Sequence, residues 1–362
     1  MMNAQRTYGA AVALRTIKRP TLRYLLPLCC VFLLFLVEVY EVISALPARH
    51  WNGTNLKAIH AADPQDFTFA VFGDNRNSRV VFENLLKRID HDPDIAFAVS
   101  LGDTVQKGNK ERYRWFLHQV RANLGIPLLT AMGNHEYRAG GPDLYRALFG
   151  PTYYSFDIGD NLFLVLDDGN GKGIDPAQRE WLVRELERCG NQRRPIVFLH
   201  TPLYDPWAGK QPKCLPRHSS EDLIRLFSRY GVGHIFASHI HGYYSGQWEG
   251  IPFTITGGGG APPEGNDPDH DFFHFLKVHI TKGQVHVAVE KLPHPLAGPI
   301  GRIFYGLWMI VSSWRFYWPY ALLPLLALCL FIGLGRRKHP TEDPGRQSAD
   351  PGREGHEISL MK

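Results

Sequence analysis

The chain has 362 residues, 44% of them hydrophobic and 21% charged, a composition typical of a globular protein with room for one large domain or two modest ones. Its net charge of +5 would suit an anionic partner, but the basic residues gather near the two ends of the chain. No nucleic-acid-binding motif is present, so the positive charge by itself does not indicate a nucleic-acid partner.

The N-terminal end predicts a membrane anchor. Residues 1–23 carry five Lys or Arg and no acid, and an apolar segment follows over 24–46. This basic flank predicts a cytoplasmic N-terminus. The strictly uncharged part, 24–37, is shorter than the roughly 20 residues of a full span, which leaves a cleaved signal peptide as the alternative. The bulky Ile43 and Leu46 at the minus-three positions of the possible cleavage sites favour an uncleaved anchor.

A second apolar segment, 316–335, is uncharged and is followed by a cluster of three basic residues. It predicts a transmembrane helix whose C-terminal end is cytoplasmic. Two spans with basic flanks on the same side predict a multi-pass protein of the cytoplasmic (inner) membrane with an extracytoplasmic central domain. Residues 293–315 predict an interfacial segment, with a buried core helix as the alternative. Residues 336–362, polar and rich in Pro and Gly, predict a disordered cytoplasmic tail.

Between the predicted spans, a linker over 47–66 leads into a domain predicted over 67–292. Helices are indicated by apolar residues at helical spacing over 78–90, 110–124, 176–189 and 219–230. Short apolar runs predict strands over 67–73, 95–102, 127–133, 153–159, 161–169, 195–200, 232–239, 243–248, 252–256, 272–280 and 284–292. Strand-helix alternation that gives way to strands alone predicts a layered α/β domain.

Polar residues of a distinctive set follow these predicted strands. They are Asp74, Asp103, Asn134, His135, His200, His239 and His241. In open α/β sheets, ligands bind outside the carboxyl ends of the strands, so these side chains are expected to converge. Each residue alone is more often a turn, cap or satisfied polar group. Together, two carboxylates, an amide and several imidazoles suit Mn, Fe or Zn, and a pair of such ions can clamp a phosphoryl group.

The motifs resemble those of the calcineurin-like metallophosphoesterase family over about 67–292. The family pattern of D-x-H, GDxxxxG, GNHE, a lone His and GHxH is matched in order by GDNR, GDTVQKG, GNHE, LHTP and SHIHG. The resemblance implies an α-β-β-α sandwich with two divalent metal ions. One ion would be held by Asp74, Asp103 and His241, and the other by Asp103, Asn134, His200 and His239. By the same resemblance, His135 would stabilise the transition state or protonate the leaving oxygen.

Two positions depart from the family pattern. Ser238 stands in place of the first Gly of GHxH, and Arg76 stands in place of the first histidine. A guanidinium cannot ligate a metal, because it keeps its proton. Purple acid phosphatases also lack this histidine but supply a tyrosine at the position of Gln106. A water, Asn75 or Gln106 could complete the first ion's shell, and Arg76 is a catalytic candidate that could fork two phosphate oxygens. GDNR resembles a bacterial variant of the family, which favours a modified working site.

The sequence predicts a membrane-anchored phosphatase that hydrolyses phosphate mono- or diesters through attack of metal-bound hydroxide. Anchoring would suit a lipid-linked phosphate ester, and it would equally suit an enzyme that degrades nucleotides or phosphomonoesters at the membrane surface. The alternative is a catalytically impaired metal-binding receptor or scaffold on the same fold. Retention of His135 argues against this alternative.

Several features remain open at the level of sequence. The glycine run 257–260 suits either a close approach to phosphate or a tight turn. Tyr204 and Trp207 could form a lid or simply anchor a loop, and His270 and His274 could be extra ligands or ordinary polar residues. Cys189 and Cys214 could pair in an oxidising compartment, but two separate thiols fit equally well.

Overall fold

In the computed structural model, the described residues are 29, 30, 32, 33, 36, 46, 48–190, 194–206, 213–294, 303, 304 and 307. The predicted spans therefore lie wholly or largely outside them, as do the two terminal segments. None of the helices in the described part of the chain combines the length and the apolar character that a membrane crossing requires. The architecture below belongs to the compact unit Tyr40–Tyr317.

The first sheet has five strands in the order β11-β10-β1-β2-β3. Strands β1, β2 and β3 are parallel, and β10 and β11 extend the sheet antiparallel beyond β1. The strands span Asp66–Phe72 (β1), Ile95–Ser100 (β2), Leu128–Thr130 (β3), His274–Thr281 (β10) and Gln284–Lys291 (β11). The parallel strands thus end at the same edge of the sheet.

The second sheet has six strands in the order β4-β5-β6-β7-β9-β8. Strands β5, β6, β7 and β9 are parallel, while the outer strands β4 and β8 pair antiparallel. The strands span Tyr154–Ile158 (β4), Asn161–Val165 (β5), Ile196–Phe198 (β6), His234–Ala237 (β7), Tyr243–Trp248 (β8) and Ile251–Thr256 (β9). This sheet also gathers the carboxyl ends of its parallel strands at one edge.

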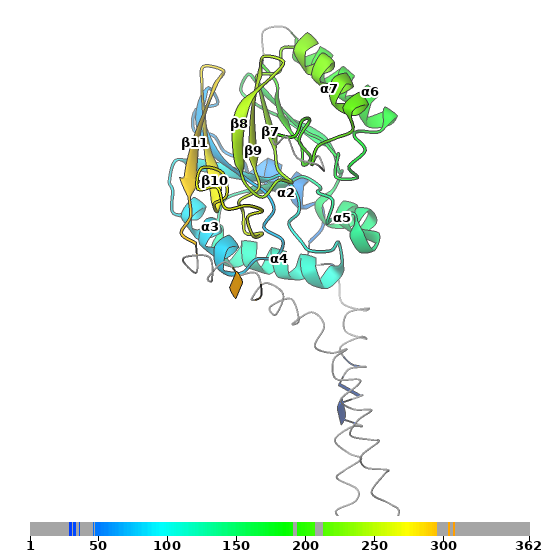
Figure 1. Cartoon of the computed structure of the whole chain (residues 1–362), viewed down its shortest axis with the longest axis vertical. Coiled ribbons are helices and arrows are strands. Elements are labelled where there is room, and N and C mark those ends of the chain that lie inside the picture. The colour runs from blue at the N-terminus through cyan, green and yellow to red at the C-terminus, as the bar shows by residue number, and fades with distance from the viewer. Residues whose placement is uncertain are drawn as a thin grey trace, which may run out of the picture. The chain divides into compact units, whose positions relative to one another are not determined.

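Helices cover the outer face of each sheet and produce four layers. The cluster of buried residues over the first sheet joins β1 and β2 to α3, α4 and α5, and the cluster over the second sheet joins β5, β6, β7 and β9 to α6 and α7. Figure 1 shows α3 and α4 together, away from the paired helices α6 and α7. The helices span Val80–Asp90 (α3), Lys110–Asn123 (α4), Gly141–Phe149 (α5), Pro176–Cys189 (α6) and Arg217–Arg229 (α7). The predicted α-β-β-α sandwich is confirmed.

Phenylalanine side chains fill the space between the two sheets. Phe69 of β1 stacks on Phe97 of β2 with ring centroids 5.0 Å apart, and its edge meets Phe163 of β5 at 5.7 Å. Alternation along each strand sends these rings inward and the next residues toward the helices. A close-packed aromatic core of this kind fixes the positions of both sheet edges.

The predicted linker 47–66 contains a helix, α2 (Trp51–Ala58), that packs against the edge of the first sheet. Trp51 Nε1 donates to Leu128 O at 2.8 Å, and the Asn52 amide both accepts from Thr130 N at 3.0 Å and donates to Thr130 O at 3.2 Å. These side chains satisfy backbone groups that a sheet edge leaves unpaired. Helix α5 and the short 3₁₀ helix η1 (Arg138–Gly140) also lie outside the helices predicted from the sequence.

Candidate metal centre

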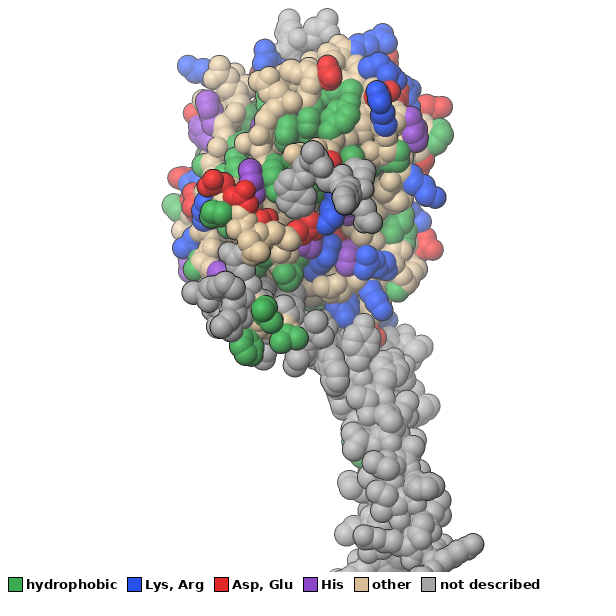
Figure 2. Space-filling model, viewed as in Figure 1, with side chains coloured by type: hydrophobic (Ala, Val, Ile, Leu, Met, Phe, Trp, Pro, Cys, Tyr) green, Lys and Arg blue, Asp and Glu red, His purple; other side chains and the backbone are tan. Residues whose placement is uncertain are grey.

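The predicted site residues lie in the loops that follow β1, β2, β3, β6 and β7, and the structure brings them together. Asp74, Arg76, Asp103 and His239 adopt positive φ angles between 43° and 69°. Non-glycine residues rarely take this conformation, and such strain concentrates at functional sites. Figure 2 shows acidic, basic and histidine side chains intermingled on one face of the domain.

One group of ligand atoms, called the second ion site here, joins Asp103, Asn134, His200 and His239. Asn134 Oδ1 lies 3.1 Å from His200 Nε2 and 3.1 Å from His239 Nδ1, and the two nitrogens are 3.2 Å apart. Asp103 Oδ1 lies 3.5 Å from His200 Nε2. Ligand atoms that share one ion at about 2.1 Å stand about 3.0–3.4 Å from one another. The four side chains therefore fit a divalent cation.

A neighbouring group, called the first ion site here, contains Asp74 and His241 and borders Asp103. Asp74 Oδ1 and His241 Nε2 are 3.4 Å apart, and both are buried without a hydrogen-bond partner. Buried polar atoms nearly always have a partner, so this pair calls for a cation between them. Asp74, Asp103 and His200 each offer a ligand atom within 4.8 Å of the others, which places the two sites side by side.

Two of the histidines are oriented by backbone carbonyls. His200 Nδ1 donates to Leu101 O at 2.9 Å, and His241 Nδ1 donates to Pro262 O at 2.8 Å. Since the Nδ1 hydrogen is used in each bond, the Nε2 lone pair of the neutral ring faces the site. Metal-ligating histidines are commonly fixed in this manner.

Ser238 orients the carboxylate of Asp74. Its hydroxyl donates to Asp74 Oδ2 at 2.5 Å, and the backbone N–H of His239 donates to the same oxygen at 2.8 Å. These two bonds occupy Oδ2 and leave Oδ1 toward His241. Ser238 therefore orients Asp74 and is more than a small residue in the place of a glycine. This role was not predicted from the sequence.

Glu136 ties together the loops after β2 and β3. Its buried carboxylate accepts from Asp103 N and Thr104 N at 2.8 Å and from Gly133 N at 2.9 Å. Burial, together with the charge of Asp103, raises the pKa of Glu136 to about 7. The carboxylate holds the bridging candidate Asp103 and the Asn134 loop in one arrangement.

Asp168 performs a similar task for the loop after β6. Its carboxylate oxygens accept from His200 N and Thr201 N, each at 2.7 Å, and burial raises its pKa to about 6. Asp168 was not among the predicted site residues. The signal that could have found it is the same as for the ligands, an acidic residue shortly after a buried parallel strand.

Burial and charge set the ionisation of the ligands. Burial alone would raise the pKa of Asp74, but His241, His200 and Arg76 together more than offset this effect and the pKa lies well below its ordinary value. For His200, burial lowers the pKa, while the charges of Asp103, Asp74 and Asp168 and the hydrogen bond to Leu101 O together outweigh burial, so the net pKa is raised. Burial lowers the pKa of His239 to about 4. The buried carboxylate of Asp74 is therefore negative, which favours a cation at the site.

His135 lies beside the ion sites without joining the ligand atoms of the second one. Its backbone N–H donates to Asp103 Oδ1 at 2.9 Å, and its Nδ1 lies 2.9 Å from Gln106 O. Its Nε2 is 3.8 Å from Asp103 Oδ2. Burial is the largest of the effects that lower the pKa of His135 to about 4.

Arg76 makes its closest contacts with the carboxylate that separates the two sites. Its Nε and Nη2 donate to Asp103 Oδ2 at 3.1 Å and 2.9 Å, and Nη2 lies 3.8 Å from Asp74 Oδ1. Asn75 donates its Nδ2 to Thr104 O at 2.9 Å, while its buried Oδ1 has no hydrogen-bond partner. The guanidinium therefore stands at the first ion site, and its contact with substrate stays a prediction.

The glycine run 257–260 packs against the loop that carries Asp74. Gly259 N donates to Gly73 O at 2.9 Å, and Ala261 N donates to Asp74 O at 2.7 Å. A Cβ atom at Gly259 would lie 2.4 Å from Gly73 O. The close approach that requires glycine is thus between two protein loops.

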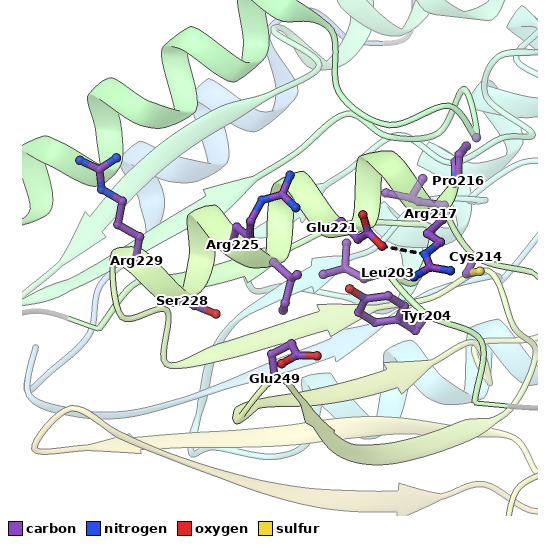
Figure 3. Close-up of a pocket in the computed structure, with 13 residues that line it drawn as sticks. Leu203, Tyr204, Cys214, Pro216, Arg217, Glu221, Arg225, Ser228, Arg229 and Glu249 are labelled. Carbon is purple, nitrogen blue, oxygen red and sulfur yellow. Dashed lines mark hydrogen bonds and ion pairs between the residues drawn. The ribbon is translucent and has the colours of Figure 1, made fainter.

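Tyr204 anchors a loop rather than reaching the ligands. Its ring packs edge-on against Trp248 at 6.0 Å, and it lines a pocket of about 1150 Å³ beside α7 (Figure 3). Trp207 lies outside the described residues. Cys214 also lines this pocket, Cys189 is the buried last residue of α6, and the two cysteines are not joined in a disulfide.

His270 and His274 make bonds away from the ligand groups. His270 Nδ1 lies 2.8 Å from Tyr243 O and its ring stacks on Tyr244, while His274 Nε2 lies 3.0 Å from Thr256 Oγ1. These contacts satisfy both rings as ordinary polar groups.

Comparison with known proteins agrees with this geometry. Residues 67–243 match the model of the calcineurin-like phosphoesterase family. The serine/threonine-protein phosphatase CPPED1 of Rattus norvegicus is 25% identical over 286 residues, covering 70% of this chain and 87% of the rat protein. A probable cyclic nucleotide phosphodiesterase of Rhodopseudomonas palustris is 26% identical over 176 residues, covering 46% of this chain and 64% of that protein.

Among solved structures, the purple acid phosphatase PPD1 of yellow lupin shares the fold. It aligns with a TM-score of 0.53 and 21% identity, covering 64% of this chain and 52% of the lupin chain. The four layers, the ordered motifs at the strand ends and the family match lead to one assignment. The chain belongs to the calcineurin-like phosphoesterase family, and it is a metal-dependent phosphoric ester hydrolase.

Proposed function

We propose that the protein is a membrane-anchored dinuclear phosphoesterase that hydrolyses phosphate mono- or diesters outside the cytoplasm. The observation that carries the proposal is the position of Asp103 between two groups of ligand atoms. Its Oδ1 lies 3.5 Å from His200 Nε2 in the second ion site, while its Oδ2 is held by Arg76, which also borders Asp74. One carboxylate can therefore serve both sites.

The residues of the two sites have distinct tasks in this proposal. Divalent ions held there would lower the pKa of water and neutralise phosphate charge. The mixed oxygen and nitrogen ligands suit Mn, Fe or Zn. His135, whose Nε2 lies 3.8 Å from Asp103 Oδ2, would stabilise the transition state beside the ions, and Glu136 keeps the Asp103 and Asn134 loops in one arrangement.

The relatives named a protein phosphatase and a probable cyclic nucleotide phosphodiesterase support a substrate class of phosphate mono- or diesters. Anchoring by 24–46 and 316–335 would keep the domain near lipid-linked phosphate esters. Ile303, Phe304 and Leu307 expose 65%, 59% and 51% of their surface, which favours contact with an apolar phase.

The test begins with chelator-treated protein assayed on p-nitrophenyl phosphate and bis-p-nitrophenyl phosphate. We expect the treated protein to be inactive and Mn, Fe or Zn to restore hydrolysis of at least one ester. If ions bind and neither ester is cleaved, the alternative of a metal-binding receptor or scaffold replaces this proposal.

The proposed topology has its own test. A reporter enzyme active only outside the cytoplasm should be active when inserted near Asn55 and silent when fused after Gly335. The reverse pattern would place the phosphoesterase domain in the cytoplasm.

A further inference from the structure

The two ion sites differ in whether a positively charged side chain already lies among their ligand atoms. In the second ion site, Asn134, His200 and His239 place their ligand atoms 3.1–3.2 Å apart with no guanidinium among them. In the first ion site, Arg76 Nη2 lies 2.9 Å from Asp103 Oδ2 and 3.8 Å from Asp74 Oδ1. The guanidinium thus already supplies positive charge to the two carboxylates that would hold the first ion.

A divalent ion bound at the first ion site next to the Arg76 guanidinium would raise the electrostatic free energy. An ion bound by Asp74 Oδ1 and Asp103 Oδ2 would lie within a few Å of Arg76 Nη2, where like charges repel strongly and burial weakens screening. Both Arg76 donors also occupy Asp103 Oδ2, the oxygen that a bridging carboxylate would offer. Binding of the first ion therefore requires the guanidinium to move.

The geometry allows such a movement. The backbone of Arg76 is fixed, because its N–H donates to Asp103 O at 2.9 Å and its φ is 43°. Its side chain keeps 19% exposure, whereas those of Asp74 and Asp103 are fully buried. The side chain can turn toward solvent while its backbone stays attached to the Asp103 loop.

We propose that Arg76 is the resident cation of the first ion site and competes with a metal ion for Asp103 Oδ2. This inference deepens the proposed phosphoesterase function and rests on it. The second ion site loads first, and the first ion site loads only as the guanidinium turns away. The released guanidinium then stands next to the site, where it can bind a phosphate oxygen.

The test is a titration of Mn(II) into chelator-treated protein by calorimetry, with electron paramagnetic resonance to separate isolated from paired Mn(II). Wild type should bind one ion tightly and a second at least tenfold more weakly. Arg76→Ala and the better shape-matched Arg76→Gln should tighten the weak ion at least tenfold and give paired Mn(II) at lower concentration. Circular dichroism checks that each variant is folded.

Arg79→Ala is the matched control, because it removes the same charge from the same loop. Arg79 is 61% exposed and its nearest acidic partner is Glu83 at 3.8 Å, so this variant should titrate like wild type. Equal affinity for two ions in wild type, or unchanged affinities in both Arg76 variants, would overturn the inference and leave the hydrolase proposal standing. If the two ion sites load unequally but neither ester is hydrolysed, the hydrolase proposal fails and the role of Arg76 as resident cation stands.

Discussion

At the scale of single residues, the candidate ligands could be picked out from the sequence and the residues that support them could not. These candidates can be recognised because each follows an apolar run and has a side chain that suits a divalent ion. They are Asp74, Asp103, Asn134 and the histidines of the site. The supporting contacts join loops that are distant in sequence, and no spacing rule reveals them. Ser238, for example, bonds to a carboxylate 164 positions away.

Ser238 provides the first prediction. Ser238→Ala removes the hydrogen bond to the buried, charged Asp74, so the metal-free protein should lose about 2 kcal/mol of unfolding free energy in a urea titration. The first ion should also bind more weakly, since Asp74 Oδ1 is no longer held in place. Ser219→Ala, which removes a bond from an exposed hydroxyl to Lys172 O, serves as control. Equal losses in the two variants would remove the special role assigned to Ser238.

At the scale of elements, the sequence predicts best where apolar periodicity and packing agree. The helix over 176–189 is predicted at its observed bounds, with Asp175 as N-cap, Pro176 in the first turn and Gly190 after its end. The apolar runs 161–169 and 195–200 extend beyond β5 and β6, because the loops that follow these strands are also buried around the site. In a sequence, a buried loop segment that is not paired in a sheet shows the same apolar run as a buried strand.

Helix α2 was missed for a related reason. Its segment WNGTNLKA lacks an apolar stripe, since its packing relies on Trp and Asn side chains that bond to the edge of β3. Hydrogen bonds to a distant strand leave no periodic signal.

The second prediction concerns this contact. Asn52 is buried, and Asn52→Ala would leave the N–H and C=O of Thr130 without these partners at the sheet edge. We expect a loss of roughly 2–3 kcal/mol in unfolding free energy, measured with urea. Thr54→Ala on the exposed side of α2 should change stability by less than about 0.5 kcal/mol. A loss at Asn52 no larger than at Thr54 would show that α2 contributes little to the sheet edge.

At the scale of the whole molecule, the two sheets bring the carboxyl ends of their parallel strands to one site. The candidate ligands span Asp74 to His241 in sequence, so they come together only when both sheets and the aromatic core between them are formed. The sequence could predict this convergence from the rule for parallel strands. It could not predict that Arg76 would contact Asp103, because that depends on the path of two neighbouring loops.

Acid sensitivity of the fold gives the third prediction. Burial lowers the pKa of His234 in β7 to about 4, against an ordinary value of 6.5. The unfolded chain therefore binds more protons between pH 6.5 and 4, so the stability contributed by neutral His234 is full above pH 6.5 and is lost as the pH falls through this window. The loss attributable to this residue is about 3 kcal/mol.

Urea titrations at pH 7 and pH 4.5 check this prediction. His234→Phe keeps a ring against Phe236 but cannot be protonated, so its stability should fall less between the two pH values than that of wild type. An identical fall in both proteins would show that His234 does not contribute to acid sensitivity.

The central claim, a metal-dependent hydrolase whose two ion sites share Asp103, is tested most directly by counting bound ions and measuring hydrolysis in the same samples. Wild type, Asp103→Asn and His135→Asn should be loaded with Mn(II), analysed by plasma mass spectrometry, and assayed on both nitrophenyl esters. We predict that Asp103→Asn loses most bound metal and nearly all activity, while His135→Asn keeps its metal and loses turnover. Equal metal content in Asp103→Asn and wild type, with hydrolysis retained, would contradict the account.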